Sequence, residues 1–391
     1  MTPTTTFEEF GARLREFIQR AAPEPFSGRR IAPAILDEQF NELALALFAL
    51  QFAHVAPYRQ FCQARGLAPG QVRAWADIPA VPTAAFKEFE LTSLPPAERT
   101  AVFHSSGTTG QRPSRHFHNA ESLALYEASL VPWFRRHLLR HFPTLRCPGP
   151  ACFVILTPPP TLTPHSSLVH MFETLRRRFG GRESAYVGTL NEGAWSVDVD
   201  AAREALSASR LRDQPVVVLG TAFAFVHLLD ALAAEECRIW LPRGSRALET
   251  GGYKGRARTV PKAHLHALIA DRLTIDEPYI VTEYGMSELS SQAYDYVAGS
   301  GDVQGAERTA QSSNHLFRFP PWARAQVCSP ESGREVAEGE TGLLRVFDLA
   351  NLRSVLAIQT EDLAVRRGKG FELLGRAPNA EPRGCSLRAT P

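Results

Sequence analysis

Hydrophobic positions near the amino terminus recur at helical spacing. Residues 7–20 form an amphipathic pattern and residues 43–52 form a second, strongly apolar one, so both segments are predicted to be helical. Residues 75–82 are predicted to form a loop, because their prolines disfavour continuation of a helix. The pattern is helical again over residues 120–140, where a kink or a restart is expected at Pro132.

The middle of the chain alternates short apolar runs with helical patterns. The apolar runs at 152–157 and 215–220 are followed by helical patterns at 166–179 and 222–234, and a further apolar run covers 237–241. Alternating strands and helices of this kind predict an α/β architecture with a largely parallel sheet.

Beyond residue 320 the pattern changes to short strands joined by tight turns. The predicted strands cover 326–328, 342–348, 354–359, 364–366 and 371–374, with a tight turn at 367–370. This spacing favours an antiparallel sheet.

Composition excludes several classes of protein. Of the 391 residues, 44% are hydrophobic and 21% are charged, as in ordinary globular proteins. The net charge of +2 comes without a long basic stripe, so nothing indicates a nucleic-acid partner. Neither a signal peptide nor an apolar run of membrane-spanning length is visible. The six cysteines form no CxxC pair, which disfavours zinc ribbons and a disulfide framework and makes a cytoplasmic protein the expectation.

The most informative segment is a run of hydroxyls and glycines near position 107. It comprises Ser105, Ser106, Gly107, Thr108, Thr109 and Gly110. Glycine lets the backbone approach a ligand, and successive N–H groups in such turns can bind an anion. The run is therefore a candidate for binding a polyphosphate, although by itself it is as typical of a mobile loop.

Four further motifs follow in order along the chain. They are Gly251–Lys254, Tyr284–Glu288, Thr360–Asp362 and Gly375–Arg376. Each has an ordinary alternative: Glu288 at the start of a helix, where the dipole favours a carboxylate, Asp362 in a turn, and the glycines in a tight loop. Each motif is therefore weak evidence when it is taken alone.

In order and separation these motifs resemble those of the adenylate-forming superfamily of acyl- and aryl-CoA ligases, peptide-synthetase adenylation domains and luciferases. Within it, the chain most resembles the LuxE-type acyl-protein synthetases. Further segments extend this likeness over nearly the whole chain: 48–62, 78–82, 86–87 and 383–387. The resemblance implies a large α/β domain of αβα-layered subdomains with a small antiparallel β subdomain, and a truncated C-terminal small domain.

On this basis the chain is predicted to divide into four parts. Residues 1–100 would be an N-terminal helical segment of the large domain, and 101–319 the α/β core that binds ATP and the acyl group. Residues 320–376 would be the antiparallel β subdomain and 377–391 a short tail.

The resemblance also implies roles for single residues. The hydroxyls and glycines of 105–110 would hold the β- and γ-phosphates of ATP, and Ser287 would meet the α-phosphate. Glu288 would ligate Mg²⁺, a cation that prefers oxygen ligands. Asp362 would accept hydrogen bonds from the ribose, and Arg376 would mark a hinge. The residues implied to border the adenine are Gly251, Gly252 and Tyr284, with Gly285 in the same nucleotide-binding motif.

The chain departs from the superfamily pattern in two ways. The phosphate loop lacks its usual final lysine, and Arg112 or Arg115 is expected to supply the positive charge instead. The chain also stops fifteen residues after Arg376, so the small C-terminal domain and its lysine are expected to be missing. Lys254 is predicted to replace that lysine. The other lysines are interpreted differently, Lys87 and Lys262 as solvated surface groups and Lys369 as a turn residue.

Cys385 is the predicted acyl acceptor, as the resemblance to LuxE-type proteins implies. It stands between Arg383 and Arg388, and nearby cations raise the thiolate fraction of a thiol. The alternative is a small packing residue or an idle thiol in the tail.

Other residues carry weaker signals. His116 and His118, like His264 and His266, share a face of a strand without further ligands at metal spacing, so a structural role is favoured. His104 is a candidate to touch a phosphate. The apolar side chains that are candidates for an acyl pocket are Leu168, Met171, Phe223 and Phe225, although core residues of amphipathic helices look the same.

The sequence thus predicts a Mg²⁺-dependent ligase that activates a carboxylic acid, expected to be fatty, as an acyl adenylate and transfers the acyl group to a thiol. A fatty acyl reductase or an acyl carrier is the implied partner. The alternatives are an acyl- or aryl-CoA ligase and, from another class, a catalytically silent nucleotide-binding scaffold.

Overall fold

The structure is a computed structural model, which describes residues 6–22, 31–105, 112–142, 150–191, 193–251, 260–299 and 316–378. The helices are α1 (Phe7–Ala21), α2 (Pro33–His54), α3 (Ala56–Gln63), α4 (Ala85–Glu88), α5 (Ala120–Leu138), α6 (Ser167–Phe179), α7 (Val199–Leu211), α8 (Ala222–Ala234) and α9 (Lys262–Leu273). Short 3-10 turns are η1 (Pro69–Gln71), η2 (Trp75–Asp77), η3 (Pro96–Glu98) and η5 (Glu277–Tyr279).

The strands fall into two large sheets and two hairpins. They are β1 (Val81–Pro82), β2 (Ala101–His104), β3 (Arg115–His118), β4 (Cys152–Ile155), β5 (Ala185–Tyr186), β6 (Gly188–Asn191), β7 (Ala194–Val197), β8 (Val216–Thr221), β9 (Arg246–Thr250), β10 (Ile280–Tyr284), β11 (Ala293–Tyr294), β12 (Leu316–Phe317), β13 (Ala323–Cys328), β14 (Thr341–Asp348), β15 (Ala357–Arg367) and β16 (Gly370–Arg376).

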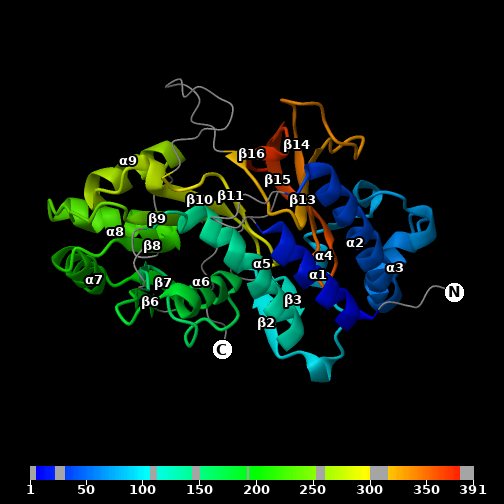
Figure 1. Ribbon diagram of the computed structural model, residues 1–391, viewed down its shortest axis with the longest axis horizontal. Coiled ribbons are helices and arrows are strands. Elements are labelled where there is room, and N and C mark those ends of the chain that lie inside the picture. Colours follow the sequence, from blue (N-terminus) through cyan, green and yellow to red (C-terminus); the bar gives the residue numbers. More distant parts are fainter. Residues whose placement is uncertain are drawn as a thin grey trace.

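The first sheet has the strand order β11-β10-β9-β8-β4-β5 and is parallel except for the β10–β11 pair. Strands β4, β8, β9 and β10 are buried along their whole length, as expected for strands covered on both faces. Helices α7, α8 and α9 lie with these strands in the green and yellow half of Figure 1. The predicted parallel α/β region is therefore confirmed.

The second sheet has the order β12-β16-β15-β14-β13, with β1 added parallel to β15. Its orange and red strands lie beside the blue helices α1 to α3 in Figure 1. The strand predicted at 364–366 and the second half of the one predicted at 354–359 belong to the single strand β15. Its pairing with β16 shifts register at Leu363/Ala364, where β16 carries one extra residue, Leu374. The turn at 367–370 is present, with Gly368 at a φ of 54°.

Helix α5 lies between the two sheets in Figure 1 and packs on both halves. It begins at the N-cap Asn119, whose side chain accepts a hydrogen bond from Ser122 N. The helix continues through Pro132 without the restart that the sequence suggested. The Trp322 indole donates to Ser129 Oγ of this helix at 2.7 Å, which ties the segment before β13 to α5.

The apolar run at 237–241 is not a strand, contrary to the prediction. Its backbone N–H groups donate to other partners instead: Ile239 N to Arg272 O at 2.8 Å and Leu241 N to Thr274 Oγ1 at 2.9 Å. The run therefore packs along the end of α9, and β9 takes the place beside β8.

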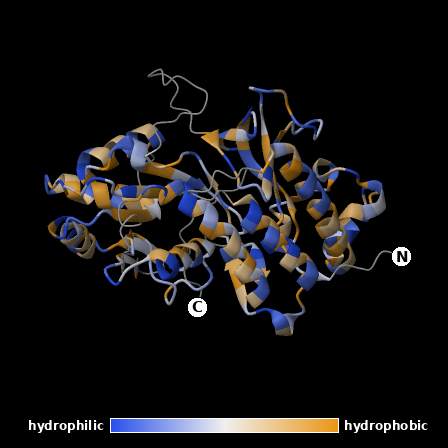
Figure 2. Cartoon of the chain, in the orientation of Figure 1, coloured by the Kyte–Doolittle hydropathy of each residue, from blue (hydrophilic) through white to orange (hydrophobic). Residues whose placement is uncertain are grey.

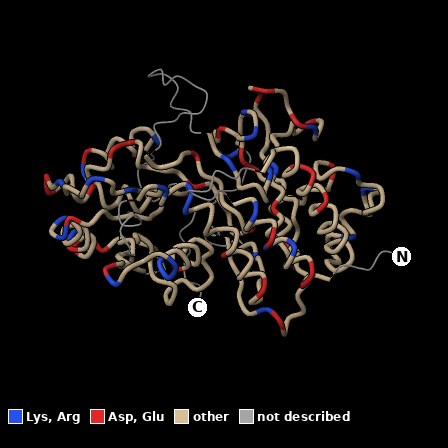
Figure 3. Tube along the Cα trace, viewed as in Figure 1, with Lys and Arg blue, Asp and Glu red and all other residues tan. Residues whose placement is uncertain are grey.

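Two hydrophobic clusters fill the interior. The larger one joins α1, α2, α5 and the antiparallel sheet to one face of the parallel sheet, and the smaller one lies between that sheet and α7 to α9. Figure 2 shows the strands of the parallel sheet as its most hydrophobic part. Figure 3 shows Lys and Arg interspersed with Asp and Glu over both halves. Within the described ranges, no helix has the length and apolarity needed to cross a membrane.

Candidate active site

A cavity of about 410 Å³ opens where the parallel sheet meets the antiparallel sheet. Its walls come from the carboxyl ends of β9 and β10, the start of α6, the middle of β15 and the end of β16. The carboxyl edge of a parallel sheet is where ligands of α/β proteins usually bind.

Most of the described residues that the sequence singled out line this one cavity. They are Ser105, Gly251, Tyr284, Gly285, Ser287, Glu288, Asp362 and Arg376. The other predicted site residues lie outside the described part of the chain: Ser106, Gly107, Thr108, Thr109, Gly110, Gly252, Lys254 and Cys385. The four motifs therefore converge, although the phosphate loop is described only at its two ends.

Glu288 joins the cavity wall to both ends of that loop. Its Oε1 accepts a hydrogen bond from Ser114 Oγ at 2.7 Å, and its Oε2 accepts one from Ser287 Oγ at 3.0 Å. Ser114 N in turn donates to Ser105 Oγ at 2.9 Å, so the residues flanking 106–111 are paired with each other. Glu288 lies in a turn and begins no helix, which removes the helix-start alternative.

The segment that carries Glu288 is held by residues between β14 and β15. Asp348 accepts hydrogen bonds from Ser290 N at 2.9 Å and from Ser291 N at 2.7 Å. Asn351 Nδ2 donates to Glu288 O at 2.9 Å. Burial raises the pKa of the Asp348 carboxyl despite these donors. The antiparallel sheet thus fixes the position of the acid that the nucleotide motif supplies.

Asp362 faces the nucleotide motif from β15. The Tyr284 hydroxyl donates to Asp362 Oδ2 at 2.8 Å, and Arg376 Nε lies 3.8 Å from Asp362 Oδ1. Arg376 also pairs with Glu361. Asp362 sits within a strand, so the alternative of a turn residue is wrong.

Two buried acids that sequence reasoning missed line the same cavity. Glu283 accepts a hydrogen bond from Thr250 Oγ1, and Glu249 accepts one from Thr282 Oγ1 at 2.7 Å. Burial raises the pKa of Glu283 to about 7, and the neighbouring Glu249 adds to the shift. The available signal was an acidic residue near the end of each of two strand patterns, Glu249 in 246–250 and Glu283 in 280–284.

The interpretation of Lys262 as a solvated surface group is wrong. The lysine lines the cavity instead of standing on the surface, with Nζ 3.4 Å from Asp295 Oδ2 and 4.7 Å from the centroid of the Phe317 ring. Lys369 does occupy a turn, as predicted, where it pairs with Asp37. The turn that carries Lys369 lies at the far end of the β15–β16 hairpin, and Lys369 does not line the cavity. Among the described residues, Lys262 is the lysine that lines it.

Of the two arginines expected to replace the loop lysine, Arg115 is already paired. Its Nη1 lies 3.2 Å from Glu90 Oε1, and its guanidinium lies over Phe117. Arg112 is exposed at the end of the loop. The geometry therefore favours Arg112 for the predicted contact with phosphate.

His116 and His118 have structural surroundings, whereas His264 and His266 lie on helix α9, so the prediction that the latter two share a face of a strand is wrong. His116 and His118 are buried on the same face of β3, and burial lowers the pKa of His116 to about 4. Neutral His116 donates from Nδ1 to Ser287 O at 3.0 Å, which supports the nucleotide motif from behind. Among the described residues, no group of three or more His, Cys, Asp or Glu side chains is placed to hold a metal ion.

The predicted acyl-pocket residues divide into two pairs. Leu168 and Met171 of α6 line the cavity, as does His104. Phe225 packs instead in the smaller hydrophobic cluster, and Phe223 stacks on His227. These two follow β8 on α8, whose inner face covers the sheet.

The surroundings of Glu288 fit a magnesium ion. Mg²⁺ is usually held by one or two carboxylates together with phosphate oxygens and water. Glu288 supplies one carboxylate, and the hydroxyls of Ser114 and Ser287 orient its two oxygens. The phosphates of a bound nucleotide would supply the remaining oxygen ligands.

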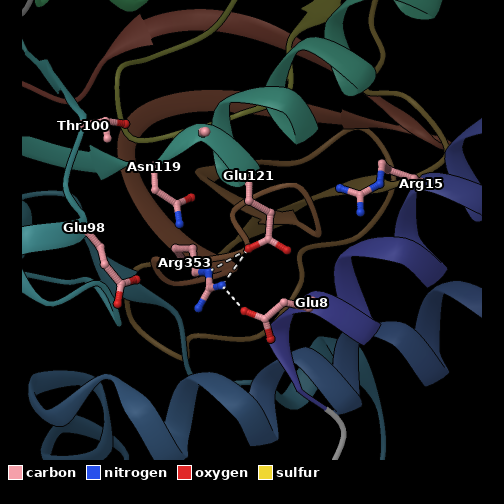
Figure 4. A pocket seen from close by; sticks show the side chains of 8 residues that line it. Glu8, Arg15, Glu98, Thr100, Asn119, Glu121 and Arg353 are labelled. Atoms are coloured by element: carbon pink, nitrogen blue, oxygen red, sulfur yellow. Dashed lines mark hydrogen bonds and ion pairs between the residues drawn. The ribbon is translucent and has the colours of Figure 1, made fainter.

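A second hollow lies against α1, on the side of the molecule shown in Figure 4. In it Arg353 reaches Glu121 Oε2 at 2.6 Å and Glu8 Oε1 at 2.8 Å. These ion pairs connect α1 and α5 to the segment between β14 and β15. Three of the charged groups in this hollow thus pair with one another, which is the arrangement of a structural junction.

Comparisons with known proteins give consistent results. The family model described as "Acyl-protein synthetase, LuxE" matches residues 33–123. A protein from Vibrio harveyi named "Long-chain-fatty-acid--luciferin-component ligase" is 21% identical over 348 residues, which span 84% of this chain and 82% of that protein.

Solved structures support the fold. An open conformation of 2-hydroxyisobutyryl-CoA ligase superimposes with a TM-score of 0.61 at 14% identity, covering 92% of this chain and 83% of that one. A second structure of that enzyme, in its thioesterification state, gives 0.62 at 14% identity over 88% and 69% of the two chains. The fold is therefore that of the adenylate-forming enzymes, and the resemblance of this chain to the LuxE-type acyl-protein synthetases, which are ligases, is confirmed.

Proposed function

We propose that this chain is an ATP-dependent ligase that converts a carboxylic acid into an acyl adenylate and passes the acyl group to a thiol. One observation carries the proposal: Glu288 is hydrogen-bonded to Ser114 at one end of the hydroxyl loop, in the cavity that also contains Ser105, Tyr284 and Asp362. The phosphate-binding and metal-binding motifs thus meet in one place.

Under this proposal each described residue takes a role that its position supports. Ser105 and the loop that follows it bind the β- and γ-phosphates, and Glu288 holds Mg²⁺, which neutralises phosphate charge when bound. Asp362 accepts hydrogen bonds from the ribose, with Tyr284 orienting its carboxylate. The carboxylate of the acid attacks the α-phosphorus, the new P–O bond forms, and pyrophosphate leaves. Holding both reactants in line accounts for much of the acceleration.

Exchange of labelled pyrophosphate into ATP, measured with a panel of carboxylic acids, tests this first step. Glu288→Gln is expected to lose exchange by about 100-fold or more, because the amide cannot replace a carboxylate as a ligand for Mg²⁺. The matched control is Glu331→Gln, an exposed carboxylate in the turn after β13, which is expected to behave like the wild type. Equal activity of the two variants would contradict the assignment of Glu288 to the ATP site.

For the second step we propose Cys385 as the acyl acceptor. The thiolate attacks the acyl carbonyl carbon, a thioester forms, and AMP leaves. Among the described cysteines, burial raises the pKa of Cys62 and of Cys152 to about 11 and raises that of Cys328 as well. A raised pKa lowers the thiolate fraction, so these three are poor nucleophiles.

Intact-mass measurement after incubation with ATP and acid checks the acceptor. The wild type is expected to gain the mass of one acyl group, and Cys385→Ala is expected to lose that gain. Cys237→Ala is the control, since Cys237 is the partly exposed cysteine of the described residues. Acylation that survives in Cys385→Ala contradicts the assignment, and release of acyl-CoA on adding CoA would instead favour a CoA ligase.

We further propose that the acyl group passes from this thioester to an acyl reductase or an acyl carrier. This partner is the one that the resemblance to the LuxE-type acyl-protein synthetases implies. ATP binding without exchange for any acid, even with such a partner added, would select the silent scaffold.

A further inference from the structure

The part of the cavity beside α6 combines apolar and polar walls. Leu168 and Met171 contribute apolar side chains from α6, and Tyr126 contributes its phenol from α5. Glu283, at the end of β10, and Gln292 also line the cavity. Gln292 Nε2 donates to the Tyr126 hydroxyl at 3.2 Å, so these two polar groups satisfy each other.

Among the described residues, the Glu283 carboxyl has one hydrogen-bond donor. Its side chain is buried, and Oε2 accepts a hydrogen bond from Thr250 Oγ1. Its other oxygen, Oε1, lies over Gly285 at the cavity wall, where a Cβ on that glycine would overlap with it.

No described cation forms an ion pair with Glu283. Lys262, which shares the cavity, pairs with Asp295, and Arg376 pairs with Glu361 and lies near Asp362. Glu283 lines the cavity, so a ligand that fills the cavity would displace water from Oε1. The desolvated oxygen then costs free energy, which a ligand that donates a hydrogen bond would recover. An unsubstituted aliphatic chain placed against Glu283 would leave that cost in full.

We propose that Glu283 is a specificity-determining residue and that the acid activated here carries a hydroxyl or amino group on its chain. This inference rests on the proposed function and replaces the expectation of a plain fatty acid with a narrower substrate class. A site built to hydrogen-bond a substituent of its substrate discriminates strongly against the analogue that lacks it, because the buried polar group is then unpaired.

Pyrophosphate exchange with matched acids tests the proposal. Hexanoic acid is compared with hexanoic acids that carry one hydroxyl or one amino group at carbon 2, 3 or 6. At least one substituted acid is expected to exceed hexanoic acid in kcat/KM by about tenfold or more, the equivalent of one recovered hydrogen bond. Glu283→Leu is expected to abolish this preference, so that the substituted acids no longer exceed hexanoic acid in kcat/KM.

Two further variants make the result specific. Glu283→Gln keeps an acceptor for Thr250 but not the charge, so it retains a preference for a hydroxyl group and loses one for an amino group. Glu277→Gln changes an exposed carboxylate just before the same strand and is expected to keep the wild-type preference. Hexanoic acid being the best substrate of the wild type, or an unchanged preference in Glu283→Leu, overturns the proposal.

Direct binding separates this inference from the proposed function. The same acids are titrated calorimetrically into wild type and Glu283→Leu without ATP, and thermal melting checks that the variant is folded. Selective binding of a substituted acid that disappears in Glu283→Leu supports the inference even if no acid gives exchange. Equal binding of all acids to both proteins contradicts it, whether or not exchange occurs.

Discussion

At the scale of single residues, Glu283 links the pocket to the pH dependence of stability. Its pKa of about 7 in the folded protein lies above the ordinary value of 4.5, because burial disfavours the charged form. Between these two values the folded state binds more protons than the unfolded state, so stability falls as pH rises from about 4.5 to about 7 and then levels off.

Replacing Glu283 with Gln is therefore expected to remove this loss. The unfolding free energy of Glu283→Gln minus that of the wild type is expected to increase by up to about 3 kcal/mol when the pH is raised from 5 to 8. Urea denaturation at both pH values measures the difference, with Glu277→Gln as the control. A difference between variant and wild type that does not change with pH would mean that Glu283 titrates normally.

At the scale of elements, the segment after β10 depends on an anchor from another sheet. Asp348→Asn turns one acceptor of the Ser290 and Ser291 N–H groups into a donor that faces them. Charge-assisted bonds of this kind are worth about 1.5–3 kcal/mol each, so stability is expected to fall by at least about 2 kcal/mol.

The catalytic consequence distinguishes positioning from general destabilisation. Because Asp348 holds the segment that presents Glu288, Asp348→Asn is expected to raise the KM for Mg-ATP at temperatures where the variant is fully folded. Denaturant titration gives the stability, and exchange kinetics at varied Mg-ATP give the KM. The KM for the acid is expected to change less, since Asp348 does not line the cavity.

The elements also show what the sequence determines locally. Alternation of apolar runs with helical patterns is a local property, so the parallel sheet and strand β10 could be predicted from the sequence. The convergence of the motifs could be predicted because their order resembles that of the adenylate-forming superfamily. Lys262 and Glu283 were missed because their exposure depends on which distant segments cover them. The run at 237–241 has the composition of a strand, but the Ile239 N–H group donates to Arg272 O of α9. This tertiary contact replaces strand pairing, and no local sequence pattern indicates it.

At the scale of the whole molecule, the N-terminal helices support the site through one buried side chain. Gln51 of α2 donates from Nε2 to Asn351 O at 2.7 Å, and its Oε1 accepts from Leu356 N at 2.8 Å. Asn351 in turn holds Glu288 O through its own amide. A chain of hydrogen bonds thus runs from α2 through the segment between β14 and β15 to the nucleotide motif.

Gln51→Leu tests whether this connection couples the two parts. The leucine fills a similar space but leaves Asn351 O and Leu356 N without their partner in a dry interior, which costs about 1–3 kcal/mol for each unsatisfied group. The variant is expected to lose about 2–4 kcal/mol of unfolding free energy in a single transition. Exposed Gln63→Leu on α3 is the matched control. If α2 instead melted separately, ahead of the rest, the N-terminal helices would be an independent unit and Glu288 would keep its environment without them.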